Sequence, residues 1–180
     1  MHSRYLVVFI LCLYTSSLRG QSMQNISIGG DLSFPSNNLK SASPSFGGSL
    51  QYLYKFNAPV GLQFHVGYNH FKDALGGKVN FLPVRAGVVS YLYEDLLYVY
   101  ADAGISHYQS PTTTTKQNGF SFGIGGGYRQ ELSKNNFLQF SAYYNLHNFK
   151  LAATSQNYNY TWFNIRAAYG FSFGREKSVR

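Results

Sequence analysis

Six ionisable residues stand where they could do chemistry, because each lies in a segment of otherwise apolar, small or neutral residues. They comprise two aspartates, one histidine and three arginines: Asp31, His65, Arg85, Asp102, Arg129 and Arg166. An arginine can hold a carboxylate or another anion through several N–H groups, and a charge removed from water needs such a partner. We expect these residues to form either a structural charge network or the lining of a pore.

No combination of residues typical of a catalytic site accompanies them. A lipase-like site on a strand would place a serine two residues after a histidine, with a carboxylate nearby. The residues at that position after His65, His70, His107 and His147 are Gly, Lys, Gln and Phe. Asp73 is close to His70 in the sequence, but both belong to a segment that we interpret as a solvated loop. We predict no catalytic residue and no enzymatic activity.

Cofactor and metal sites are not predicted either. The glycines of the segment Gly123–Gly127 lie inside a strand pattern and precede no helix, so they do not form a phosphate-binding loop. The histidines are dispersed and the single cysteine, Cys12, falls in the N-terminal apolar segment, so no group has the spacing of metal ligands. We therefore expect no cofactor and no metal.

The segment from Asn80 to Tyr108 shows which elements position the charged residues. Val84, Ala86 and Val88 alternate with Arg85 and a glycine, and apolar residues alternate in the same way around Asp102. This period of two is typical of strands with two different faces. The pattern predicts a long hairpin, with its turn at Glu94-Asp95, that carries Arg85 and Asp102 on its polar face.

The same alternation recurs along the chain and predicts eight strands. They cover approximately residues 24–34, 46–56, 60–69, 79–93, 96–108, 120–129, 138–147 and 163–173. Short turns near Ala58, Glu94 and Asn135 alternate with four longer polar segments. Strands of about this length, with short turns at one end and longer loops at the other, are typical of membrane barrels. We predict an all-β fold, an eight-stranded antiparallel up-and-down transmembrane β-barrel.

The N-terminus has the three regions of a signal peptide. His2 and Arg4 are followed by the apolar run Leu6–Tyr14 and then by a small and polar segment. We predict a signal peptide over residues 1–20, with cleavage near Gly20-Gln21 or, alternatively, near Ser17-Leu18. The barrel domain is predicted over residues 21–173 and a charged periplasmic tail over 174–180. After the signal, no apolar run approaches the roughly 20 residues that a membrane helix needs.

The composition indicates which face of the strands meets water. Charged residues make up only 12% of the chain and aromatic residues 18%. Lysine and glutamate are nearly absent from the middles of the strands, whereas a solvated face would be rich in them. We therefore place the polar face inside the barrel and the apolar face in lipid. The net charge of +8 comes from scattered residues, so no nucleic-acid partner is predicted.

Aromatic residues gather near the predicted strand ends, where membrane barrels carry interfacial girdles. We assign to such girdles Tyr52, Tyr54, Phe56, Tyr91, Tyr93, Tyr98 and Tyr100 near the short turns, and Tyr158, Tyr160 and Trp162 near a loop.

Residues 81–108, which read FLPVRAG, then SYLY, then LYVYADAGISHY, resemble the outer-membrane protein beta-barrel (porin-like) family of Gram-negative bacteria, small eight-stranded type. The resemblance implies the cell outer membrane as location, contact with outer-membrane lipid, and insertion by the barrel-assembly machinery. Many such barrels end on an aromatic residue that this machinery reads. Here seven residues follow Phe173, so the signal for assembly is expected to be internal.

Three functions remain open on these grounds. The first is a non-catalytic, monomeric barrel with a filled polar interior that presents four extracellular loops to an unknown ligand. The second is a narrow porin-like channel for small solutes with Arg85, Arg129 and Arg166 at its constriction. The third is a soluble periplasmic ligand-binding barrel.

Overall fold

The computed structural model describes residues 23–37, 39, 42–56, 59–72, 77–93, 96–110, 115–150 and 157–173. The predicted signal peptide, the predicted tail, the Glu94-Asp95 turn and residues 111–114 lie outside the described residues. Among the described residues, no helix is long and apolar enough to cross a membrane.

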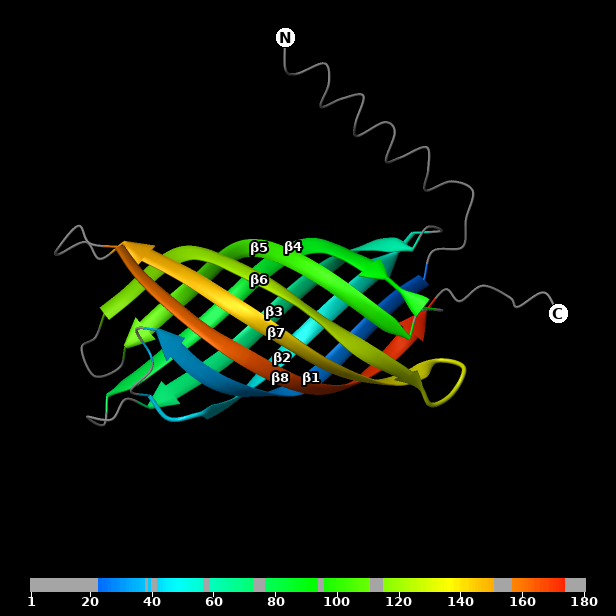
Figure 1. Ribbon diagram of the computed structural model, residues 1–180, viewed down its shortest axis with the longest axis horizontal. Coiled ribbons are helices and arrows are strands. Elements are labelled where there is room, and N and C mark those ends of the chain that lie inside the picture. Colours follow the sequence, from blue (N-terminus) through cyan, green and yellow to red (C-terminus); the bar gives the residue numbers. More distant parts are fainter. Residues whose placement is uncertain are drawn as a thin grey trace, which may run out of the picture.

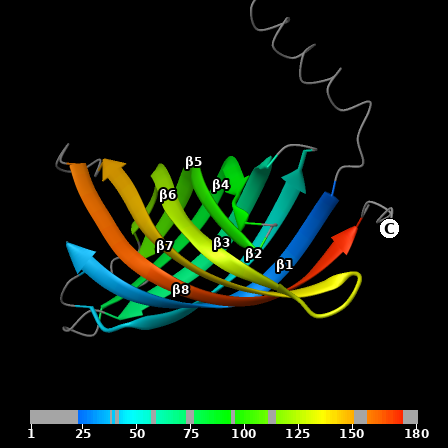
Figure 2. The ribbon, with the colours of Figure 1, turned by 45° about the vertical axis from the view of Figure 1, so that its right-hand side comes forward.

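Eight strands form one closed barrel, as the alternation predicts. They are β1 Met23–Asn37, β2 Ser45–Lys55, β3 Val60–Lys72, β4 Lys78–Tyr91, β5 Leu97–Ser110, β6 Thr115–Glu131, β7 Asn136–Lys150 and β8 Asn157–Phe173. Each strand pairs antiparallel with the next, and β8 pairs with β1 to complete the barrel. Figure 1 shows the strands inclined to the long axis, and in Figure 2 the end of β8 lies beside the start of β1. The predicted fold is confirmed.

Several strands are longer than the alternation predicts. The polar segment 109–118 was expected to be a loop, yet β5 continues to Ser110 and β6 begins at Thr115. Gln109 and Lys116 are register partners there, because backbone pairing does not depend on whether the side chains are apolar. The strands have 11 to 17 residues, and about 9 to 11 suffice to cross a bilayer. Their polar ends therefore extend beyond the apolar band.

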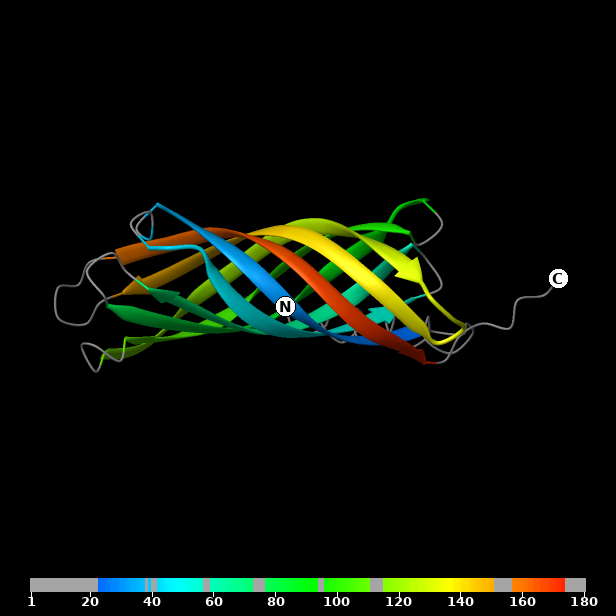
Figure 3. The same ribbon diagram turned by 90° about the horizontal axis from the view of Figure 1, so that it is seen from below.

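The two ends of the barrel differ in their connections. At one end, which we call the turn end, Phe56 N–H donates to Val60 O, and equivalent bonds join Leu92 to Leu97 and Leu132 to Asn136. Met23 and Phe173, the first and last strand residues, lie at this end too. The other end, the loop end, carries the connections after β1, β3, β5 and β7. Figure 3 shows the strands running between these two ends of the barrel.

The faces of the wall are inverted relative to a soluble protein. Val88 is 55% exposed on the outside, whereas Arg85 is 2% exposed and lies inside. The same alternation holds along β3, where every second residue from Val60 to Tyr68 is exposed. An apolar exterior around a polar interior is the arrangement of a membrane barrel. The alternative of a soluble ligand-binding barrel is therefore wrong.

Candidate functional site

The middle of the interior contains an ion pair between two strands of the central hairpin. Arg85 on β4 places its Nε 3.0 Å from Oδ1 of Asp102 on β5, and both side chains are fully buried. Gln63 Nε2 on β3 donates to the other carboxylate oxygen of Asp102 at 2.8 Å. Arg85 Nη1 donates to Asn145 Oδ1 on β7 at 2.5 Å. Both charges therefore have polar partners contributed by other strands of the barrel.

A glycine on β6 leaves the space that this ion pair occupies. A Cβ added at Gly123 would collide with Asp102 Oδ1 and would lie 2.8 Å from Arg85 Nη1. Other glycines of this segment also lie close to their surroundings. An added Cβ at Gly125 or Gly127 would meet interior side chains or backbone, whereas one at Gly126 would meet the β5 backbone and Val99.

A second arginine, Arg166 on β8, holds a polar network nearer the turn end. Its Nε donates to Ser49 Oγ at 2.8 Å, and its Nη2 donates to Ser27 Oγ at 3.1 Å. Its Nη1 is shared between Gln139 Oε1 at 3.2 Å and Gln51 Oε1 at 3.4 Å. The two glutamines are also linked to each other, with Gln139 Nε2 donating to Gln51 Oε1 at 2.8 Å. The guanidinium is thus fixed by side chains from three other strands.

The other predicted interior residues are also buried, and two of them lie directly opposite an arginine already described. His65 is the register partner of Arg85, and Asp31 is the register partner of Arg166. Asp31 Oδ1 accepts a hydrogen bond from Tyr143 at 2.7 Å. His65 lies edge-on to the Tyr143 ring, with ring centroids 5.9 Å apart. Arg129 Nη2 donates to Ser172 Oγ at 2.7 Å, and its guanidinium stacks 4.1 Å from the centroid of Phe137. Five of the six predicted residues therefore lie in two groups, Arg85 with Asp102 and His65, and Arg166 with Asp31, whereas Arg129 lies nearer the turn end.

An aromatic cluster on the turn-end side of the ion pair was not predicted as an interior feature. It consists of Leu53, Val89, Tyr91, Tyr98, Tyr100 and Tyr143. Three of these tyrosines, Tyr91, Tyr98 and Tyr100, were assigned to a lipid-facing girdle, and that assignment is wrong. They point inward, and Tyr98 accepts a hydrogen bond from Gln139 Nε2 at 2.5 Å. Tyr98 and Tyr100 share the parity of Asp102 on β5, and Tyr91 shares the parity of Arg85 on β4, which was the signal that could have placed them inside.

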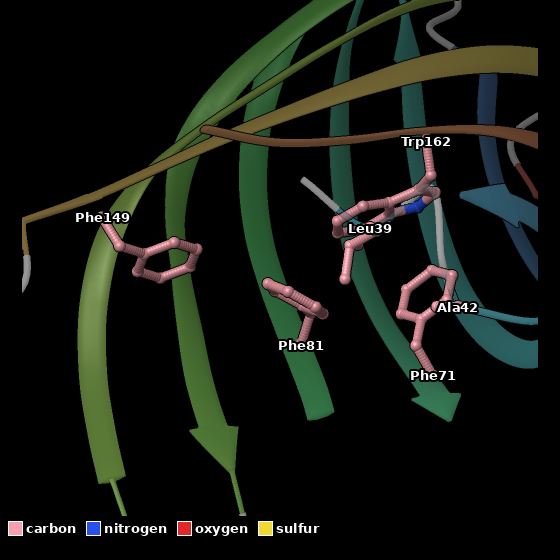
Figure 4. Close-up of a cluster of buried hydrophobic side chains, with 6 residues drawn as sticks. All are labelled: Leu39, Ala42, Phe71, Phe81, Phe149 and Trp162. Atoms are coloured by element: carbon pink, nitrogen blue, oxygen red, sulfur yellow. The ribbon is translucent and has the colours of Figure 1, made fainter. Parts of the chain in front are cut away.

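The loop end of the interior is filled by a larger aromatic cluster. Its buried members are Leu39, Ala42, Phe71, Phe81, Phe149 and Trp162, with Val79, Tyr108 and Tyr160 packed against them. Figure 4 shows Phe81 between Phe149 on one side and Leu39, Phe71 and Trp162 on the other. Leu39 and Ala42 come from the connection after β1, so a loop contributes to the filling.

Trp162 is the clearest correction to the predicted girdles. Its side chain is 0% exposed, and its ring stacks on His147 with centroids 4.2 Å apart and planes 6° apart. It is also 4.8 Å from the centroid of Phe81. Trp162 has the same parity as Asn164 and Arg166 on β8, which is the parity of the interior.

Some polar atoms along the interior have no hydrogen-bond partner within the described protein. They include the side-chain amide of Asn25 near the turn end, Nδ1 of His65, and both ring nitrogens of His147 nearer the loop end. Such atoms are the positions that water or a small polar solute would satisfy. Among the described residues, no group of three or more His, Cys, Asp or Glu side chains is placed to hold a metal ion.

Comparison with known proteins assigns the chain to a family. The family model described as "Outer membrane protein beta-barrel domain" matches residues 6–171. No curated protein matches the sequence.

Solved structures share the fold at low sequence identity. The attachment invasion locus protein Ail of Yersinia pestis has 19% identity and a TM-score of 0.60 over 86% of this chain and 100% of its own. Neisserial surface protein A has 16% identity and a TM-score of 0.54 over 86% and 98%. OprG from Pseudomonas aeruginosa has 12% identity and a TM-score of 0.50 over 86% and 97%. The chain therefore belongs to the outer membrane protein beta-barrel domain family and is an eight-stranded barrel of the cell outer membrane.

Proposed function

We propose that this protein is a non-catalytic outer-membrane barrel whose interior is a sealed scaffold and whose loops form an interaction surface. The observation that carries the proposal is the filling of the lumen. A charge network centred on Arg85 and Asp102 lies between the tyrosine-rich cluster near the turn end and the cluster around Phe81 and Trp162 at the loop end.

The physical reason for a sealed lumen is its width. An eight-stranded barrel leaves an interior just wide enough for side chains to fill. Here the largest fully buried side chains include Trp162, Arg166, Phe71 and Phe81. The N–H groups of Arg166 donate to acceptors on the protein. The guanidinium would therefore have to lose several hydrogen bonds before it could bind an anion moving through the lumen.

We place the turn end in the periplasm and the loop end outside the cell. The predicted signal peptide exports the chain, and both ends of the barrel domain then lie on the side from which it is inserted. Short turns on that side and longer loops on the other are the usual arrangement of such barrels. We further propose that the protein is a monomer in outer-membrane lipid and is inserted by the barrel-assembly machinery.

The nature of a loop ligand is suggested only by analogy. The structure of Ail from Yersinia pestis contains sucrose octasulfate, described as a heparin analogue. A barrel of this fold can therefore present a surface to a soluble ligand. The loop connections after β1, β3, β5 and β7 are the corresponding region of this chain.

Planar-bilayer recording tests the sealed scaffold. Folded protein, verified by its heat-modifiable mobility on gels, should give no stable conductance steps. A variant with Phe81→Ala and Trp162→Ala lacks two rings of the loop-end cluster, and its conductance shows what a barrel with a less completely filled lumen gives in the same assay. Reproducible open channels from the parent protein would refute the proposal.

A second candidate is the slow passage of small solutes through the interior. Buried polar atoms of Asn25, His65 and His147 that have no partner among the described residues favour it, because they are spaced along the lumen. In this case conductance would be present, and replacement of Arg85, Arg129 and Arg166 by alanine would change the ion selectivity. Conductance with unchanged selectivity would exclude these arginines as the constriction.

A further inference from the structure

The outward face of the β3–β4 hairpin changes character toward the loop end. Val66 and Val84 are register partners in its apolar part. Nearer the loop end, His70 and Asn80 are partners, and their side chains are hydrogen-bonded with His70 Nδ1 2.5 Å from Asn80 Oδ1.

The last register pair of this hairpin is Lys72 with Lys78, and both side chains are exposed. The order along the wall is therefore apolar, then histidine or asparagine, then lysine.

The β5–β6 hairpin repeats this order. Ile105 and Phe120 are exposed partners in the apolar part. Further along, His107 Nδ1 lies 2.7 Å from Asn118 Oδ1 across the two strands. The next outward pair is Gln109 with Lys116, of which Lys116 is exposed.

The β7–β8 hairpin shows the order a third time. Tyr144 and Phe163 are exposed partners in the apolar part. Asn148 Nδ2 then donates to Asn159 Oδ1 at 2.7 Å. The final pair is Lys150 with Asn157, both exposed. Three hairpins thus place exposed lysines at the same step beyond the apolar band.

Charges elsewhere on the described barrel are arranged differently. Among the described residues, the acidic ones are Asp31 and Asp102 in the interior and Glu131 at the turn end. Basic strand residues near the turn end are turned inward, since Lys55 lies over the Tyr91 ring and Arg129 is buried. Asp73, which follows Lys72 in the sequence, lies outside the described residues. The outer wall near the loop end is therefore positively charged at four described positions.

We propose that Lys72, Lys78, Lys116 and Lys150 form a lysine belt that binds the phosphate groups of lipid A in the outer leaflet. The lysines are on the lipid-facing side of the strands. Each lies two residues closer to the loop end than a neutral polar pair, and these pairs lie between the lysines and the apolar band. This is the level at which lipid headgroups meet a membrane barrel. Lysine binds phosphate as a flexible point charge, which suits headgroups that are not held in one orientation.

The geometry favours a lipid over a soluble anionic glycan as the occupant. A glycan would approach from the loops above the barrel, whereas these lysines project sideways from the wall in continuity with the lipid-facing residues. The lysine belt rests on the proposed function in one respect only, which is the placement of the loop end on the outer side of the membrane. Failure of the conductance experiment would leave it unaffected.

The test measures the affinity of the folded full-length protein in detergent micelles for bisphosphorylated lipid A, with phosphate-free lipid A as the comparison ligand. The test variant combines Lys72→Gln, Lys116→Gln and Lys150→Gln. The matched control is Lys134→Gln, which removes an exposed lysine in a turn at the opposite end. An interfacial lysine contributes about fivefold to the binding of an anionic lipid surface, so the triple variant should lose roughly 100-fold. The control should bind like the parent.

Several outcomes would overturn the proposal. One is equal affinity of the parent and the triple variant for bisphosphorylated lipid A, and another is equal affinity of the parent for the two lipids. A third is that the triple variant keeps lipid A binding while losing binding to a heparin oligosaccharide, which would assign the lysines to a soluble glycan. If the triple variant does not fold, Lys150→Gln alone should still show a loss of about fivefold.

Discussion

Arg85 and Asp102 form a diagonal ion pair, because each is directly opposite a glycine on the neighbouring strand. Arg85 is the register partner of Gly104, and Asp102 is the register partner of Gly87. A Cβ at Gly87 would lie 2.6 Å from the Cβ of Asp102, and one at Gly104 would lie 2.8 Å from the Cα of Arg85. Long side chains can reach diagonal neighbours across a sheet. The glycines leave the charged side chains room to meet at 3.0 Å.

Asp102→Asn should destabilise the barrel strongly. The substitution leaves the Arg85 guanidinium fully buried without its counter-charge, and breaking such a pair costs about 3–5 kcal/mol. Urea unfolding in lipid vesicles, followed by heat-modifiable gel mobility, measures the change in free energy of unfolding.

The matched control for this substitution is Glu131→Gln. The carboxylate of Glu131 is 3.9 Å from Arg129 Nη2, and its side chain is 42% exposed. An exposed pair of this kind contributes less than about 1 kcal/mol. Similar losses for Asp102→Asn and Glu131→Gln would show that the buried ion pair has no special role in stability.

Gly123→Ala should destabilise the barrel through the same ion pair. The added methyl group would collide with the Asp102 carboxylate and the Arg85 guanidinium, and such overpacking costs about 1–3 kcal/mol. The control is Gly30→Ala on the outer face, where an added Cβ meets nothing within 4 Å. The same unfolding assay should find Gly30→Ala close to the parent, and equal losses at the two positions would contradict a steric role for Gly123.

Alternation along each strand was enough to predict the fold and the interior position of Arg85 and Asp102. It could not predict their partners, because Gln63 and Asn145 come from β3 and β7. The register of the strands from β3 to β7 places both in the same row as Asp102. Contacts of this kind depend on the stagger of all eight strands, which no local pattern contains.

The girdle prediction failed for a different reason. Trp162 and Tyr98 were assigned by their position near strand ends, although their parity matched interior residues such as Arg166 and Asp102. At each end of a membrane barrel the wall has an inner face and an outer face. Only the parity of a residue along its strand shows which face its side chain is on. Aromatic residues at the ends of these strands therefore include both lipid-facing rings and the filling of the lumen.

The fluorescence of Trp162, the only tryptophan in the chain, should report a dry site that is also remote from lipid. Its ring packs against His147, Phe71 and Phe81 inside the barrel. Neither aqueous iodide nor lipids brominated along the acyl chain should quench it efficiently. Phe64→Trp in a Trp162→Phe background is the control, because Phe64 is 49% exposed on the outward face of β3. Strong quenching of Trp162 by brominated lipid would place it in a girdle after all.

Val84→Arg should be costly even though the next residue is already an arginine. Val84 is near the middle of β4 and faces outward, while Arg85 faces the lumen, where it has polar partners. An arginine facing lipid at the bilayer midplane costs about 2–4 kcal/mol, and one near the interface costs about 0–1 kcal/mol. The control is Asn118→Arg, an outward position near the loop end. Unfolding from lipid vesicles should show the larger loss in free energy of unfolding for Val84→Arg, because only the guanidinium at position 84 would lie in the hydrocarbon of the bilayer. Equal losses at the two positions would mean that the apolar band does not extend across the middle of β4.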